Sequence, residues 1–586
     1  MTATIEAGGV TFTVRAPAAV ALWLCLFDGE EEHRVAMARD GEGWRVHVAG
    51  IGEGTRYGLR AEGEPPFDLA KLLVDPHAIE LDRPFAYDPR LAERGADTAA
   101  LVPRAIVRAL LPTLDLPPLP RAGGLIYEIN VRGFTMLHPD VPAAQRGTVA
   151  ALAHPAVLAH LLKVEVDAVE LMPITAWIDE RHLPPLGLRN AWGYNPVVPM
   201  ALDPRLVPGG VRELRDTVAA LRAAGIGTIL DLVFNHTGES DELGPTLSLR
   251  GLDDTAYARA PDGTLINDTG TGNTLDFAQG WVRALVCDSL RHFVAQAGVD
   301  GFRFDLATVM ARGPGFAADA PIFAEIAADP LLRDRMMIAE PWDTGPGGYQ
   351  LGAFPEGWWE WNDRYRDDVR RFWRGDGGMG ALATRLSGSS DVFGPERARG
   401  VSFVAAHDGF TLADFVAHAE RHNHANGEDN RDGHGSEIAW NNGVEGGSDD
   451  PMVLARRAAD ARALLATLFA TRGTVLLTAG DEFGRTQHGN NNAYAQDNAT
   501  TWLDWAGRDV ALEDFVAELA TLRRALPALR DPVLRHDARW YRLDGAPMRD
   551  PDWGDADGFE LRLPEFSVRI DRAARRVEMR AAPLSR

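Results

Sequence analysis

Residues 301–305, Gly-Phe-Arg-Phe-Asp, place an arginine two positions before an aspartate inside an apolar run. Successive side chains of a β-strand point to opposite faces, so Arg303 and Asp305 share one face and the two phenylalanines lie on the other. Taken alone, an Arg-x-Asp pair is most often an ordinary salt bridge. Its meaning therefore depends on what accompanies it in the chain.

Three further apolar runs deliver polar side chains at their ends. Residues 337–339 lead to Glu340, residues 401–406 lead to His407 and Asp408, and residues 228–234 lead to Asn235 and His236. Four strands with polar groups near their C-terminal ends are typical of the active face of a (β/α)8 barrel. The sequence therefore predicts an α/β protein with a TIM barrel.

The order of apolar segments supports the barrel. From residue 125 onward strand-like and helix-like segments alternate, which is typical of a parallel sheet. The helix-like segments include residues 149–163 and 281–297. The eight expected strands lie near 125–131, 168–173, 228–234, 301–306, 336–340, 358–361, 401–406 and 475–478. The sixth, around 358–361, has the least distinct pattern. We expect the barrel to occupy residues 113–528, with a loop insertion at about 235–280.

The segments that flank the barrel carry short alternating runs without helical periodicity. Residues 1–112 predict an N-terminal β-sandwich, and residues 529–586 predict a short C-terminal β-domain. Trp23 and Trp44 could stack on sugars, but both lie in strand patterns, so we expect them in the core. In the aromatic cluster at 358–373, the helix-spaced members are also expected in the core, whereas Trp358 or Trp361 could face the cleft.

Composition excludes several classes of partner. There are 60 basic and 84 acidic residues, a net charge of −24, which argues against nucleic acid. The only cysteines are Cys25 and Cys287, so we expect no disulfide framework and no cysteine metal site. We find neither a secretory signal nor a membrane span, and we expect a cytoplasmic protein without a membrane partner. Nothing in the sequence indicates an oligomeric state.

In their order, the four polar-ended segments resemble the signature regions of the α-amylase family of glycoside hydrolases. Residues 191–196 (AWGYNP), 339–343 (AEPWD), 480–487 (GDEFGRTQ) and 490–505 resemble isoamylase-type debranching enzymes more closely. The resemblance extends from about residue 10 to residue 550. It is strongest with the bacterial glycogen debranching enzymes.

The resemblance implies a role for each carboxyl group. Cleavage of a glycosidic bond needs one carboxyl group to attack the anomeric carbon and another to protonate the leaving oxygen. Asp305 matches the nucleophile, Glu340 the general acid/base, and Asp408 the third carboxylate, which holds sugar hydroxyls. An adjacent Arg303 would lower the pKa of Asp305. No cation adjoins Glu340 in the sequence, so we expect the two pKa values to differ.

Further substrate contacts are implied by the same resemblance. His236 and His407 match histidines that hydrogen-bond the sugar at the cleavage point, Tyr194 would stack beneath that sugar, and Trp342 would wall the acceptor side. By itself a histidine after a strand is more often a packed or capping residue, and a loop tyrosine is as readily buried.

Asp231 and Asn235 are expected to be scaffold residues. In calcium-dependent relatives the position of Asn235 binds metal, but this chain has no oxygen-rich EF-hand-like run. We therefore assign no metal and no cofactor.

The leading interpretation is a retaining hydrolase of α-1,6 branch links in glycogen or phosphorylase limit dextrin, with a preference for short side chains and an α-glucan as its partner. Loops 237–275 and 422–450 would shape its substrate groove. One alternative is a trehalose-releasing hydrolase or a branching transferase; Trp342 and residues 490–492 weigh against it. The other is a non-catalytic glucan-binding protein. Such proteins typically lose their carboxylates, and here Asp305, Glu340 and Asp408 remain.

Overall fold

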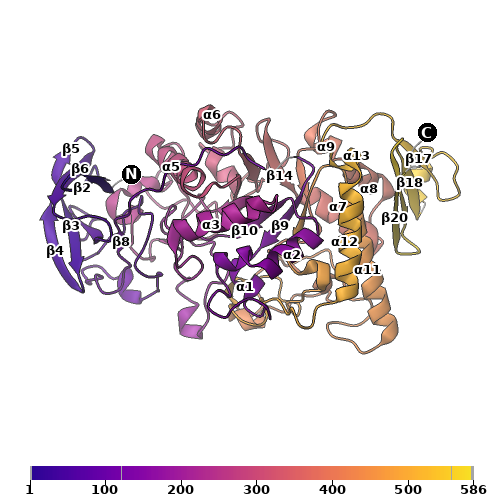
Figure 1. Ribbon diagram of the computed structural model, residues 1–586, viewed down its shortest axis with the longest axis horizontal. Helices are drawn as coiled ribbons and strands as arrows, with labels where there is room; N and C mark the ends of the chain where they lie inside the picture. Colours follow the sequence, from indigo (N-terminus) through magenta and orange to yellow (C-terminus); the bar gives the residue numbers. More distant parts are fainter. Residues whose placement is uncertain (1–2, 120–121, 556, 582–586) are drawn as a thin grey trace.

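The computed structural model describes residues 3–119, 122–555 and 557–581. Three parts follow one another along the long axis of the molecule: N-terminal sheets at one end, a barrel in the middle and a C-terminal sheet at the other end (Figure 1).

The central part is a closed barrel of eight parallel strands, as the sequence predicts. Each strand pairs with the next along the chain, and the last pairs with the first. The strands are β9 (Leu125–Ile129), β10 (Ala168–Leu171), β11 (Gly227–Leu232), β12 (Gly301–Phe304), β13 (Met336–Ala339), β14 (Trp358–Asn362), β15 (Gly400–Ser402) and β16 (Thr474–Thr478).

Strand alternation separates the barrel interior from its surroundings. Alternate residues such as Ile229, Ile338 and Leu476 form an apolar cluster inside the barrel. Phe302 and Phe304 belong instead to the larger core that includes the helices. This arrangement confirms the prediction that Arg303 lies on the opposite face of its strand from the two phenylalanines.

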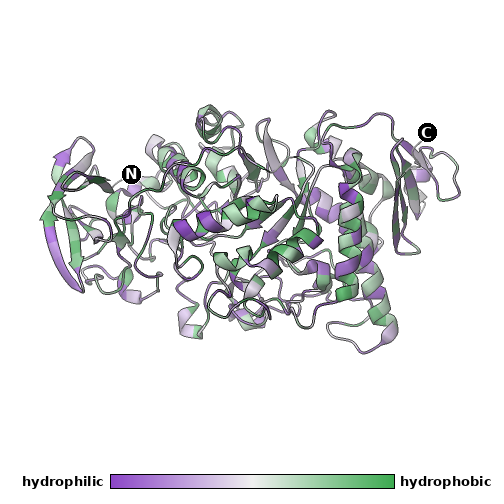
Figure 2. Ribbon diagram, in the orientation of Figure 1, coloured by the Kyte–Doolittle hydropathy of each residue, from purple (hydrophilic) through white to green (hydrophobic). Residues whose placement is uncertain are grey.

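Helices surround the strands and carry both hydrophobic and hydrophilic residues (Figure 2), as expected when one side packs on a sheet and the other meets solvent. The α-helices of the described residues are α1 (Val131–Thr135), α2 (Pro155–Lys163), α3 (Gly210–Ala223), α4 (Leu249–Leu252), α5 (Gly280–Ala297), α6 (Pro321–Ala328), α7 (Asp363–Arg374), α8 (Met379–Leu386), α9 (Ser390–Phe393), α10 (Leu412–Phe415), α11 (Pro451–Phe469), α12 (Val510–Arg524), α13 (Pro527–Arg530) and α14 (Asp552–Asp555).

Two expected elements differ in extent. The helix expected at 149–163 is divided into a 3-10 turn, Val149–Ala153, and α2, because His154 is extended before Pro155. A residue before proline is disfavoured in the helical region, which explains the break. The strand expected at 401–406 ends at Ser402, and the following residues continue without ladder pairing.

The N-terminal part contains two four-stranded antiparallel sheets over a shared core. Trp44 is 7% exposed and its indole N–H donates to the carbonyl of Ala16, so its expected core position is confirmed. Trp23 is only half-buried. The strands are β1 (Ala3–Glu6), β2 (Gly9–Arg15), β3 (Ala21–Asp28), β4 (Glu31–Ala36), β5 (Ala38–Asp40), β6 (Gly43–Ala49), β7 (Arg56–Glu62) and β8 (Ala105–Ile106).

The C-terminal part is an antiparallel sheet in the order β17-β18-β19-β20. Its strands are β17 (Arg539–Tyr541), β18 (Gly558–Arg562), β19 (Phe566–Asp571) and β20 (Arg576–Ala581). Cys25 and Cys287 are both buried free thiols. Within the described ranges, every helix is too short or too polar to cross a membrane.

Candidate active site

The polar residues at the strand ends meet because β11, β12 and β13 are adjacent and in register. Asp231 of β11 pairs with Arg303 of β12. Phe304 pairs with Ala339 of β13, so the next residues, Asp305 and Glu340, leave the sheet side by side. The register thus brings two carboxyl groups together from segments that are 35 residues apart in the sequence.

Arg303 lies at the centre of this cluster, and its side chain is fully buried. Its Nη1 donates to both carboxylate oxygens of Asp231, at 2.9 and 3.0 Å, and to Oδ1 of Asp305 at 3.0 Å. Its Nη2 lies 3.0 Å from Oε2 of Glu340. The guanidinium carbon lies 4.4 Å from the ring centroid of Trp361. One guanidinium therefore holds three carboxyl groups in fixed positions.

The contact with Glu340 corrects part of the sequence analysis. Arg303 was expected to stabilise Asp305 alone, since no cation adjoins Glu340 along the chain. The parallel pairing of β12 and β13 instead places the guanidinium against both groups. Contact with Arg303 therefore does not distinguish Asp305 from Glu340.

Burial explains the protonation of Glu340. Loss of solvent raises the pKa of this carboxyl group to about 7, with a further upward contribution from the charge of Asp305. Arg303 and the backbone N–H of Leu306, which donates to Oε2 at 2.7 Å, oppose the rise. A carboxyl group with this pKa can donate a proton near neutrality, as a general acid must.

Asp305 is held by the amide of Asn235, whose Nδ2 donates to the Asp305 carbonyl at 2.8 Å and to its Oδ2 at 2.7 Å. Asp231, 1% exposed, is tied to Arg303. Burial raises the pKa of Asp231 to about 6, although the arginine opposes the rise. Both residues thus hold the cluster in place from behind, as the sequence analysis expects of scaffold residues.

Tyr194 and His407 form a stacked pair beside the carboxyl cluster. Their ring centroids are 4.8 Å apart with an interplanar angle of 23°. The Tyr194 hydroxyl donates to Oδ2 of Asp231 at 2.6 Å, and Nδ1–H of His407 donates to Oε1 of Glu128 at 2.7 Å. Burial lowers the pKa of His407, but the adjacent Glu128 carboxylate outweighs burial and raises it above its ordinary value.

His236 is more enclosed than the sequence analysis implies. It is 2% exposed; its Nε2–H donates to the carbonyl of Tyr194 at 3.0 Å, and Nδ1 contacts Oδ1 of Asn235. Burial lowers its pKa. In this arrangement both ring nitrogens of His236 are engaged by the protein.

Asp408 and Trp342 lie at the edge of the cluster. Asp408 is half-exposed and accepts a hydrogen bond from Nε2–H of His434 at 2.9 Å. Burial raises the pKa of Asp408, but the hydrogen bond and the charge of His434 outweigh that effect and lower it to about 2. Trp342 is half-buried against the apolar cluster inside the barrel.

Sequence reasoning missed two neighbours of the site, Glu128 and His434. Glu128 lies on β9 with its side chain against His407, and its position on an expected strand could have revealed it. Trp361, one of the two tryptophans that could face the cleft, is 2% exposed and lies against the Arg303 guanidinium. His434 lies in a long loop, and no local pattern distinguishes it from other loop histidines.

A cavity of about 460 Å³ adjoins Tyr194 and Trp192, within the range of ligand pockets, about 300–1,000 Å³. Its walls come from several loops, including Gly238 and Thr271 of the segment 237–275 and Glu428 of the segment 422–450. The Tyr494 hydroxyl donates to Oε1 of Glu428 at 2.7 Å, which fixes that part of the wall. Both long loops thus contribute ordered residues beside the cluster.

A (β/α)8 barrel with three strand-end carboxyl groups around one buried arginine, flanked by a β-sandwich, defines a glycoside hydrolase of the α-amylase type. Residues 1–78 match carbohydrate-binding module 48, the isoamylase N-terminal domain. The chain is 45% identical to the glycogen debranching enzyme of Serratia proteamaculans (strain 568), over 96% of this chain and 87% of that protein. It is 44% identical to that of Yersinia enterocolitica, over 94% and 88%. The chain belongs to the glycogen debranching enzyme family.

Solved structures agree on the fold. The pullulanase of Anoxybacillus sp. LM18-11 in complex with maltotetraose superposes with a TM-score of 0.74, over 98% of this chain and 81% of that one, at 23% identity. The pullulanase of Paenibacillus barengoltzii in complex with maltohexaose and α-cyclodextrin gives 0.72, over 99% and 94%, at 22% identity.

Proposed function

We propose that this glycoside hydrolase cleaves α-1,6 branch links of glycogen or phosphorylase limit dextrin with retention of configuration. The observation that carries the proposal is the single buried guanidinium of Arg303 between Asp305 and Glu340. It holds a nucleophile and an acid on one side of the barrel mouth. The names of the relatives at 44–45% identity supply the substrate class.

In the proposed reaction, the Asp305 carboxylate attacks the anomeric carbon while the glycosidic bond breaks. Glu340 protonates the departing oxygen, which leaves a covalent glycosyl–Asp305 ester. Glu340, now ionised, takes a proton from water, and the resulting hydroxide displaces Asp305 from the same carbon. The pKa of about 7 at Glu340 suits a group that must give and then accept one proton.

The remaining residues would bind and orient the sugar. Tyr194, stacked on His407, offers an aromatic surface beside the carboxyl groups. Asp408, ionised and half-exposed, would accept hydrogen bonds from sugar hydroxyls, and Trp342 would border the acceptor side. His236 would contact sugar only after releasing one of its present partners, so we assign it mainly to the support of Asn235 and Tyr194.

Residues of both long loops border the cavity beside Tyr194. Closure of its donor end by these loops would exclude long chains sterically and give the proposed preference for short side chains. The proposal gives residues 1–112 the role of a glucan-binding module, residues 113–528 that of the catalytic barrel and residues 529–586 that of a short C-terminal domain. A cytoplasmic location is supported by the two buried free thiols.

Two comparisons test the function. Reducing-sugar release should be fast on glycogen and very slow on linear amylose; the reverse order would identify an enzyme acting on another bond. Limit dextrin should give a higher kcat/KM than native amylopectin with long branches. A preference for long branches would refute the selectivity and leave the assignment as a hydrolase intact.

A further inference from the structure

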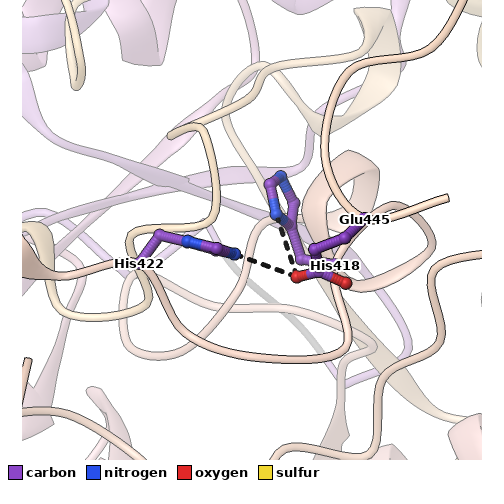
Figure 3. Close-up of side chains that lie close together, drawn as sticks. All are labelled: His418, His422 and Glu445. Carbon is purple, nitrogen blue, oxygen red and sulfur yellow. Dashed lines mark hydrogen bonds and ion pairs between the residues drawn. The ribbon is translucent and has the colours of Figure 1, made fainter.

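Two histidines and a glutamate meet in the loop that follows β15, away from Arg303 and its carboxyl groups. Nε2 of His422 lies 2.9 Å from Oε1 of Glu445, and Nδ1 of His418 lies 3.6 Å from the same oxygen (Figure 3). One ligand-type atom from each side chain lies within 4.8 Å of the others. We propose that His418, His422 and Glu445 bind one Zn²⁺ ion that fastens this loop.

The nitrogen of His418 that faces the cluster is the second, independent observation. His418 is 93% buried, being 7% exposed, yet its Nδ1 has no hydrogen-bond partner within the described parts of the chain. Buried polar atoms are nearly always paired, so an unpaired nitrogen directed at a carboxylate needs an explanation. A bound cation would satisfy it.

The distances suit zinc. Two ligand atoms at about 2.0–2.1 Å from a tetrahedral zinc ion lie roughly 3.3 Å apart. The two contacts of Glu445, at 3.6 and 2.9 Å, bracket that separation. Two neutral imidazoles and one carboxylate form a donor set that zinc uses with a fourth position left for water. His422 and Glu445 are partly exposed, so water has access.

Backbone hydrogen bonds hold the carboxylate ligand in place. The N–H groups of Ala419 and Glu420 donate to Oε2 and Oε1 of Glu445, at 2.8 and 3.3 Å. The carboxylate is therefore positioned beside the two histidines by its own loop.

Residues behind the cluster orient its ligands. Oδ1 of Asp414 lies 3.8 Å from Nε2 of His418, on the side away from Glu445. A carboxylate fixes the ring of a metal-binding histidine when the two are hydrogen-bonded; at 3.8 Å Asp414 contributes its charge beside the ring, without a hydrogen bond. Asn441 donates to Oε2 of Glu445 at 3.0 Å, and the backbone N–H of Glu420 donates to Oε1 at 3.3 Å, so Oε1 faces the two histidines with one backbone partner already in place.

Gly489 joins the site to the loop after β16. A Cβ at this position would lie 2.6 Å from Nδ1 of His418 and 2.8 Å from Cδ2 of His422, so a side chain here would displace the ligands. The carbonyl of Gly489 accepts the backbone N–H of His422 at 2.7 Å. Two residues on, the carbonyl of Asn491 accepts the N–H of Gly409, the residue after Asp408. An ion here would therefore stabilise the two loops that adjoin Asp408.

The experiment measures zinc binding by the full-length protein after chelator treatment and dialysis. We expect one Zn²⁺ per chain and a rise in Tm when zinc is added. H422A and E445Q should bind zinc more than about 100-fold more weakly, since loss of an outer partner alone costs about 10–100-fold, and should lose the rise in Tm. Glutamine keeps one side-chain oxygen, which can still accept the backbone N–H of Ala419, so E445Q preserves this loop contact.

H33A is the matched control, because His33 is an exposed histidine of the N-terminal part, with 57% side-chain exposure. It should bind zinc like the wild type. An anomalous difference map at the zinc edge, from crystals soaked in ZnCl₂, provides a second measurement that needs no variant. A peak bordered by His418, His422 and Glu445 would support the site. Wild-type protein without bound zinc, zinc binding unchanged in H422A and E445Q, or an anomalous peak elsewhere only would overturn it.

Discussion

Replacing Arg303 by lysine is the most direct test of how the active site is organised. The substitution keeps the positive charge and removes the planar fork of donors. Arginine reaches Asp231 and Asp305 through Nη1 and Glu340 through Nη2. A lysine ammonium is a single nitrogen and cannot hold the same separated positions. We expect a folded protein with a severe loss of turnover.

The magnitude follows from the contacts that are lost. A hydrogen bond to a charged group contributes about 1.5–3 kcal/mol, and each 1.4 kcal/mol corresponds to about tenfold. The hydrogen bond to Asp305 alone is therefore worth about 10- to 100-fold in rate. If lysine retains only the contact with Asp231, this hydrogen bond and the ion pair with Glu340 are both lost, and kcat falls by at least about 10- to 100-fold.

The assay compares kcat, KM and the pH profile on limit dextrin. The charge of Arg303 lowers the pKa of Glu340, and a lysine held by Asp231 would place its charge farther from Glu340. In R303K this pKa should therefore rise, and the alkaline limb should move to higher pH. R60K is a matched control, since Arg60 is 1% exposed and pairs through two nitrogens with Glu32 in the N-terminal part. It should lower Tm and leave kcat unchanged. An R303K enzyme with most of its activity and an unmoved alkaline limb would refute the reasoning.

The other predictions concern the carboxyl groups and metal dependence. D305N and E340Q should each retain the wild-type Tm within a few degrees and lose at least about 10²–10⁴ in kcat; near-normal turnover by either variant would contradict the role given to that residue. With the wild-type enzyme, NMR of the first-formed product should show the α-anomer, and an initial β-anomer would exclude a retaining mechanism. In H434A the pKa of Asp408 should rise from about 2 toward its ordinary value, so the acidic limb of the activity profile should move to higher pH. An unmoved limb would mean that His434 does not control the pKa of Asp408. Treatment with a chelator should leave kcat unchanged at temperatures well below Tm, because Asp305 and Glu340 supply the nucleophile and the acid without a metal. A loss of kcat that calcium restores would instead place an ion near Asn235.

The fold could be predicted from sequence because its signals are local. The alternation of side chains along residues 301–305 predicts which of them share a face of β12. The helix expected at 281–297 is observed as Gly280–Ala297. Polar groups at the ends of successive strands identify the active face of the barrel, so the identity and the neighbourhood of Asp305 and Glu340 could also be inferred. The sixth strand, indistinct in sequence, is observed as Trp358–Asn362 because its neighbours β13 and β15 complete its pairing.

The rest depends on contacts between distant segments. The second contact of Arg303, with Glu340, arises from strand register, which adjacency in the sequence does not express. The cluster of His418, His422 and Glu445 closes through a loop of more than twenty residues with little periodicity. Cysteine pairs and EF-hand-like runs are metal-binding patterns that a sequence displays locally, and neither includes two histidines and a distant carboxylate.

Arg303 contacts both Asp305 and Glu340, so the rise in the pKa of Glu340 must come mainly from burial. Burial of Glu340 increases when substrate enters. A glucan over the cluster would exclude water from Glu340 and raise its pKa further. Glu340 must be protonated to act as the acid, so activity is present below its pKa and declines as pH rises through it, starting from about 7 in the free enzyme. The profile of kcat/KM reports the free enzyme and that of kcat reports the complex. The alkaline limb of kcat should therefore lie at higher pH than that of kcat/KM. Coincident limbs, or a kcat limb at lower pH, would mean that a charge, and not burial, controls the proton on Glu340.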